Sequence, residues 1–141
     1  MTVQCESAGT IYSSVAPAVP RELFPSSVES VFDRLECIAQ DDNLYEEGEV
    51  RPTTETIQWA KRVLLRVIPR YYLRTAEIDV FQGEIHVTWE RGDRRVVAFL
   101  PSPGLLKLYL EYPKENGEME HLLRSTSVPW AINSFLKWLY S

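Results

Sequence analysis

Residues 78–112 read IDVFQGEIHVTWERGDRRVVAFLPSPGLLKLYLEY, and this stretch decides the fold because apolar and polar residues alternate along most of it. Two short turns, Gln82-Gly83 and Gly92-Asp93, separate runs of this alternating kind, as expected for β-hairpins with two-residue loops. Pro101-Ser102-Pro103-Gly104 supplies a third turn. The stretch therefore predicts four antiparallel strands that follow one another in a meander.

The two short turns predict the strand register independently, and the two predictions agree. Closing Gly92-Asp93 places Trp89 opposite Val96, and closing Gln82-Gly83 places Ile78 opposite Val87. Both turns put the same apolar residues on one face of the sheet. We expect helices to cover this face, which is predicted to carry Ile78, Val80, Ile85, Val87, Trp89, Val96, Ala98, Leu100, Leu105 and Tyr109.

The opposite face is predicted to be polar on the first two strands and apolar on the next two. Its polar part contains Glu77, Asp79, Glu84, His86, Thr88 and Glu90. Its apolar part contains Val97, Phe99, Leu106, Leu108 and Leu110. An antiparallel sheet with one solvated face does not normally carry such a second apolar block. We therefore predict that another helix covers these five residues or that they form a partner-binding surface.

Helical patterns lie on both sides of the meander. A capping pattern at Ser26 begins one helix that runs to about Gln40. Pro52-Thr53-Thr54 begins a second helix, which Pro69 ends because proline cannot continue a helix. A third helix follows Ser127. Residues 118–124 are a candidate fifth strand.

These elements predict one α+β domain over residues 25–141, with a four- to five-stranded antiparallel meander sheet, two N-terminal helices and one C-terminal helix. A chain of 141 residues is long enough to bury a core of its own without a metal or disulfide. Residues 1–24 are rich in Ser, Ala, Thr and Pro, and we expect them to form a flexible or wrapping arm.

Composition limits the function classes. Fifteen Lys and Arg against twenty Asp and Glu give a net charge of −5, which argues against a non-specific nucleic-acid binder. Cys5 and Cys37 have the spacing of neither a disulfide framework nor a zinc site. No segment has the pattern of a signal peptide or the length of a membrane span. We expect a protein of the reducing cytoplasm with no metal, no cofactor and no membrane contact.

The basic residues concentrate in one place, on the outer side of the second helix and just beyond it, at Arg62, Arg66, Arg70 and Arg74. Such side chains are candidate phosphate contacts, so a nucleic-acid-contacting accessory protein is one alternative function. A solvated helix face is the preferred interpretation because the overall charge is negative.

The register places Asp79 opposite His86, and an acid beside a histidine can serve in general acid–base catalysis. A small enzyme using this pair is a second alternative. A cross-strand ion pair is the preferred interpretation, because no nucleophile motif or phosphate loop accompanies the two residues. We therefore predict no enzyme and no catalytic residue.

Four pieces of the chain resemble a loosely defined group of small, uncharacterised bacterial proteins. They are Asp41-Asp42-Asn43-Leu44-Tyr45, Arg51-Pro52-Thr53, Ile68-Pro69 and Gly83-Glu84-Ile85-His86-Val87-Thr88-Trp89-Glu90. The group has an Asp-rich loop resembling Trp-Asp-Gly-Tyr, a Pro-Ser/Thr helix and a Gly-Glu-Ile-x-x-x-Trp hairpin. This chain has Leu44-Tyr45 where the loop would have Trp-Asp.

The resemblance implies a bacterial accessory protein, of the kind encoded beside a toxin, a phage-defence component or a mobile-element gene, with no known activity. Together with the apolar block, it leads us to predict a non-enzymatic protein-interaction module of antitoxin, immunity or defence-accessory type. Its expected partner is another, larger protein or a second copy of the chain.

Overall fold

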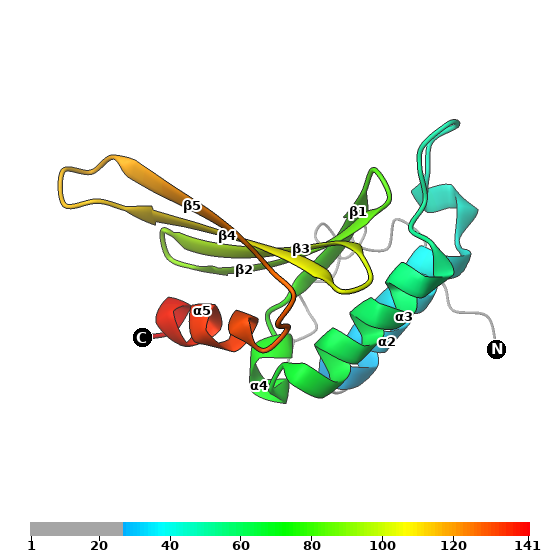
Figure 1. Cartoon of the computed structure of the whole chain (residues 1–141), viewed down its shortest axis with the longest axis horizontal. Coiled ribbons are helices and arrows are strands. Elements are labelled where there is room, and N and C mark those ends of the chain that lie inside the picture. The colour runs from blue at the N-terminus through cyan, green and yellow to red at the C-terminus, as the bar shows by residue number, and fades with distance from the viewer. Residues whose placement is uncertain (1–26) are drawn as a thin grey trace, which may run out of the picture.

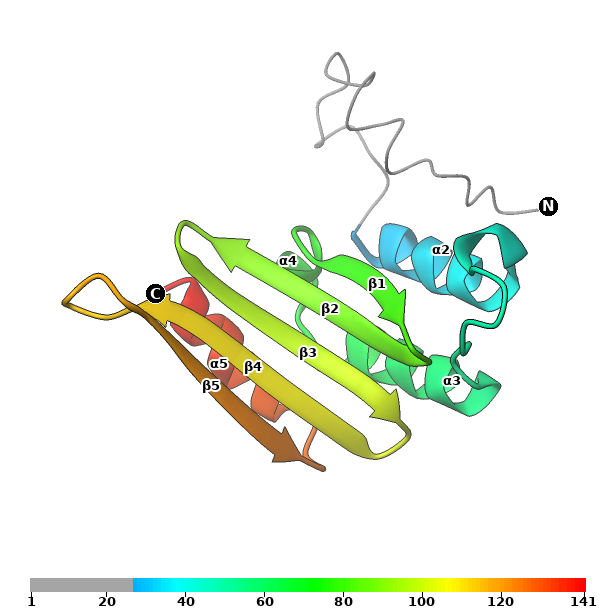
Figure 2. The same cartoon turned by 90° about the horizontal axis from the view of Figure 1, so that it is seen from above.

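The computed structural model describes residues 27–141. The expected arm over residues 1–24 and the expected cap at Ser26 lie outside the described residues. Residues 27–141 form an α+β fold in which helices lie on one face of a five-stranded antiparallel sheet (Figure 1; Figure 2). The predicted fold class is confirmed.

The helices contribute one layer. α2 (Ser27–Gln40) is followed by a short 3-10 turn (Asp42–Leu44), by α3 (Thr54–Arg62) and by a π-helical segment (Val63–Val67). The short helix α4 (Arg70–Leu73) then leads into the sheet, and α5 (Ala131–Leu139) follows it. α3 begins where the sequence predicts, because the Thr53 hydroxyl accepts a hydrogen bond from the Thr56 backbone N–H at 3.1 Å.

The last helix begins later than the sequence predicts. Ser127 does not cap it, because residues 127–130 form a turn in which the backbone N–H of Ala131 donates to the Val128 carbonyl at 3.1 Å. α5 packs on β2 and β3, and its three fully buried side chains join the main core: Ile132, Leu136 and Leu139.

The five strands lie in sequence order across the sheet, as predicted for a meander. They are β1 (Glu77–Phe81), β2 (Glu84–Arg91), β3 (Arg94–Ser102), β4 (Leu105–Pro113) and β5 (Met119–Thr126). Ile78 pairs with Val87 and Trp89 with Val96, so the register predicted from the two short turns is confirmed. Gln82 and Gly83 both have positive φ, at 53° and 79°, as a tight hairpin turn requires.

The predicted face of β4 is wrong. Phe99 pairs with Lys107 and Ser102 with Leu105, so two residues of β3, Leu100 and Pro101, stand opposite Leu106 alone. This β-bulge shifts the register by one residue, and a one-residue shift moves every following side chain to the other face. Proline suits the site because it has no N–H to give to a strand ladder.

The bulge places three residues of the predicted partner-binding block inside the protein. Leu106, Leu108 and Leu110 face the helices and are buried beside Val96 and Ala98 in one hydrophobic core. Tyr109, which was expected in that core, lies on the opposite face. The prediction that all five residues of the block share the exposed face is therefore wrong, and only Val97 and Phe99 remain there.

Two further features concern the helices. None of the helices within residues 27–141 has the length and apolar character needed to cross a membrane. Cys37 is buried in α2.

Candidate functional site

The face of the sheet opposite the helices, called here the open face, is not covered by any element of residues 27–141 (Figure 2). Cross-strand pairing arranges its side chains in rows. One row runs from Glu77 through Thr88, Val97 and Tyr109 to Leu123. The next row runs from Asp79 through His86, Phe99 and Lys107 to Ser125.

Aromatic side chains gather at the β1–β3 part of the open face. The His86 ring lies edge-on to the Phe99 ring, with 4.6 Å between their centroids, and 6.3 Å from the Phe81 ring. Phe81 is 59% exposed although it is a large apolar residue, and Leu123 on the far strand is 61% exposed. The open face thus has apolar side chains at both ends of its width.

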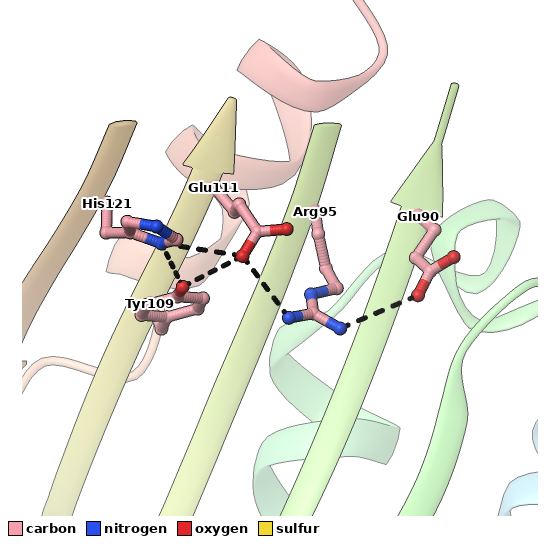
Figure 3. Close-up of polar contacts among 5 residues, drawn as sticks. All are labelled: Glu90, Arg95, Tyr109, Glu111 and His121. Atoms are coloured by element: carbon pink, nitrogen blue, oxygen red, sulfur yellow. Dashed lines mark hydrogen bonds and ion pairs between the residues drawn. The ribbon is translucent and has the colours of Figure 1, made fainter. Parts of the chain in front are cut away.

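A chain of polar contacts crosses the open face from β2 to β5 and joins Glu90, Arg95, Glu111, Tyr109 and His121 (Figure 3). The Tyr109 hydroxyl donates to Glu111 Oε2 at 3.0 Å and is also hydrogen-bonded to His121 Nδ1. Arg95 Nη2 donates to Glu111 Oε2 at 3.4 Å, and Arg95 Nη1 lies 4.0 Å from Glu90 Oε1. The Glu111 carboxylate therefore contacts a phenol, an imidazole and a guanidinium.

The environment changes the acidity of Tyr109. Burial raises the pKa of its hydroxyl, the neighbouring Glu111 carboxylate raises it further, and Arg95 acts in the opposite direction. The phenol is therefore a hydrogen-bond donor that stays protonated near neutral pH. Sequence reasoning missed the network because it put Tyr109 on the wrong face, and the available signal was Pro101 within a strand pattern.

The structure does not bring Asp79 and His86 into a hydrogen bond, although their predicted cross-strand pairing is confirmed. Asp79 Oδ1 accepts from the Val80 backbone N–H at 2.8 Å and lies 3.7 Å from Arg34 Nη2. His86 Nε2 instead lies 3.7 Å from Glu84 Oε1. Burial lowers the pKa of His86, and the Glu84 and Asp79 carboxylates only partly oppose that effect. The imidazole is thus held mainly by aromatic packing and by its neighbour on β2.

The four arginines lie in the helical layer. They are in α3, in the π-helical segment, in α4 and directly after α4. Arg62, Arg66, Arg70 and Arg74 are all exposed, and within residues 27–141 none pairs with another side chain. Tyr71, beside Arg70, is 68% exposed. Within residues 27–141 these four guanidinium groups are therefore free to contact a ligand such as a phosphate.

No three His, Cys, Asp or Glu side chains gather as a metal site in the part of the chain that the structure describes. No protein-family model, curated protein or solved structure matches the chain. The resemblance to small bacterial proteins over residues 41–112 stays a prediction.

Proposed function

We propose that the chain is a non-enzymatic protein-interaction module that binds another protein through the open face of its sheet. The observation that carries this proposal is the exposure of Phe81 and Leu123 on a face that no described element covers. Exposed apolar side chains rimmed by polar ones mark interaction surfaces. Phe99 and Tyr109 lie between these two ends and add aromatic area, which is enriched at protein interfaces.

Charge on the open face indicates the chemistry of the partner. Glu77, Asp79 and Glu84 line its β1–β2 side, with Asp79 near Arg34 and Glu84 near His86, and Arg95 is engaged by Glu90 and Glu111. A complementary partner surface has an apolar centre and basic residues at the rim that meets β1 and β2. The resemblance to bacterial accessory proteins supports a larger protein of a toxin or defence system as the partner.

The test compares the tagged full chain with a Phe81→Asp, Leu123→Asp double variant in capture from the source cells, followed by titration of the captured protein. Both positions are exposed, so the substitutions spare the core. Truncating or charging two interface anchors costs at least about 1.4 kcal/mol, so the dissociation constant should rise at least about tenfold.

The control is Tyr71→Asp, which places one such charge at a similarly exposed aromatic residue of the helical layer. It should leave the affinity unchanged. An affinity that survives the double variant, or one that Tyr71→Asp lowers as much, would contradict binding through the open face.

A second candidate function is nucleic-acid contact through the helical layer, because Arg62, Arg66, Arg70 and Arg74 are exposed and unpaired within the described residues and have exposed Tyr71 among them. Fluorescence anisotropy with single- and double-stranded oligonucleotides tests it. Neutralising up to four phosphates predicts that log K falls with log salt with a slope of about −3 to −4. A flat salt response, or equal binding by an Arg62→Gln, Arg66→Gln variant, would end this candidate.

A further inference from the structure

The two edges of the sheet differ in how their backbone groups are satisfied. At the β1 edge, the Ile78 carbonyl accepts from Arg34 Nε of α2 at 3.0 Å, and the Val80 N–H donates to the Asp79 side chain at 2.8 Å. In an antiparallel strand these two residues point their backbone groups to the same side. Since Ile78 points toward α2, both belong to the outer edge, and side chains of the protein satisfy these two edge groups.

The β5 edge has no such protection. Within the described chain, no group outside β4 hydrogen-bonds the backbone of residues 119–125. The strand has eight residues in a continuous register with β4 and contains no lysine, proline or bulge. Its two charges on the helix-facing side, Glu120 and Arg124, have opposite signs, so they disfavour an arbitrary strand but suit one of complementary charge. An unprotected edge of this length is a template for another strand.

The side chains of β5 are exposed on both faces. α5 contacts β3 and β2, and Figure 2 shows it running beneath β4 beside β5. On the helix-facing side of β5, Leu122 is 37% exposed, and Arg124 has no partner among the described residues. Glu120 lies on the same side and pairs with Lys114 at 2.7 Å.

We propose that a second copy of this chain occupies the β5 edge, so that β5 pairs antiparallel with β5 and the two sheets become one ten-stranded sheet. Residues opposite each other in such a pair share a face of the sheet. The two-fold axis must therefore pass through a residue position, and not between two positions.

Charge distinguishes among the candidate positions on the helix-facing side. An axis through Leu122 puts Glu120 of each copy opposite Arg124 of the other, on both sides of a Leu122–Leu122 contact. An axis through Glu120 or Arg124 would set like charges against each other, which destabilises a cross-strand pair. The Leu122 axis also aligns nearly the whole of β5 with its symmetry copy, because Leu122 lies near the middle of the strand.

This pairing goes beyond the proposed function, because it uses the edge of the sheet and not the open face. The helices of both copies lie on the same side of the joined sheet. The two open faces then form one continuous surface, which doubles the area available to the partner protein.

Sedimentation equilibrium and native mass spectrometry of the full chain test the proposal. The expected particle has twice the monomer mass of 16.3 kDa. Glu120→Arg and Arg124→Glu each create two repulsive pairs and should raise the dimer dissociation constant at least tenfold. The double variant Glu120→Arg, Arg124→Glu should restore the dimer, although it does not restore the Lys114 pair within each chain.

The matched control is Glu77→Arg, the same charge change on the β1 edge, which should leave the dimer intact. A chain that stays monomeric at all concentrations would overturn the proposal. A dimer that neither single charge reversal weakens would overturn it as well, because its interface would lie elsewhere.

A second measurement stands even if the charge variants fold poorly. Opposite Cα atoms of an antiparallel pair are about 4.5–5.5 Å apart, within the range that a disulfide spans. Leu122→Cys should therefore cross-link to itself under mild oxidation, detected by mass spectrometry as two joined copies of peptide 115–124. Leu123→Cys should not, because the axis leaves its two copies diagonal to each other. Cross-linking at position 123 in place of 122 would overturn the proposed register.

Discussion

Leu108→Ala is the substitution that most directly tests the faces of β4. Leu108 is 1% exposed and stands opposite Ala98, whose methyl group cannot extend into the space that the substitution opens. Burying a leucine side chain contributes about 1.5–3 kcal/mol, and the unfilled cavity adds to the loss. We expect the free energy of unfolding to fall by about 3 kcal/mol, within the range of about 2–5 kcal/mol typical of such changes.

Urea unfolding followed by circular dichroism measures this loss, and thermal unfolding should show a midpoint lowered by roughly 10 °C. Lys107→Ala is the control, because the neighbouring side chain lies on the open face, where substitutions usually change stability by less than about 0.5 kcal/mol. A loss below about 1 kcal/mol for Leu108→Ala, with an unchanged m-value, would refute the bulge and return Leu108 to the exposed face.

Two further predictions concern a turn and a titrating group. Gly83→Ala should destabilise the fold more than Gly92→Ala. Both glycines have positive φ, but only at Gly83 would an added Cβ meet another atom, Val50 Cγ1, at 2.9 Å. Equal midpoints of urea unfolding for the two variants would contradict this. Burial lowers the pKa of His86 in the folded chain. As the pH is lowered through the ordinary histidine pKa of about 6.5, the unfolded chain therefore binds more protons than the folded chain, and the free energy of unfolding decreases. His86→Gln should therefore lose less stability than the wild type between about pH 7 and about pH 5, and parallel stability–pH curves would show that His86 does not contribute.

The candidate site was predictable only in part. Val97 and Phe99 were placed correctly on the open face, because the two short turns determine the register of the first three strands. The contacts of Tyr109 with Glu111 and His121 were not predictable, because they depend on the face of β4 and on the pairing of β5. The exposure of the β5 edge was equally hidden, since a sequence pattern does not show which strand lies last or what covers it.

The sequence by itself determined the α+β class, the meander order and the register from Ile78 to Leu100. These follow from local chemistry, namely glycine in tight turns and apolar residues at every second position. Only the tertiary structure decided the faces of β4, because a single bulge at Leu100 and Pro101 inverts them and apolar side chains occupy both alternating sets in that strand. Packing resolved the ambiguity, because burying Leu106, Leu108 and Leu110 against the helices removes more apolar surface from water than burying Leu105, Lys107 and Tyr109 would.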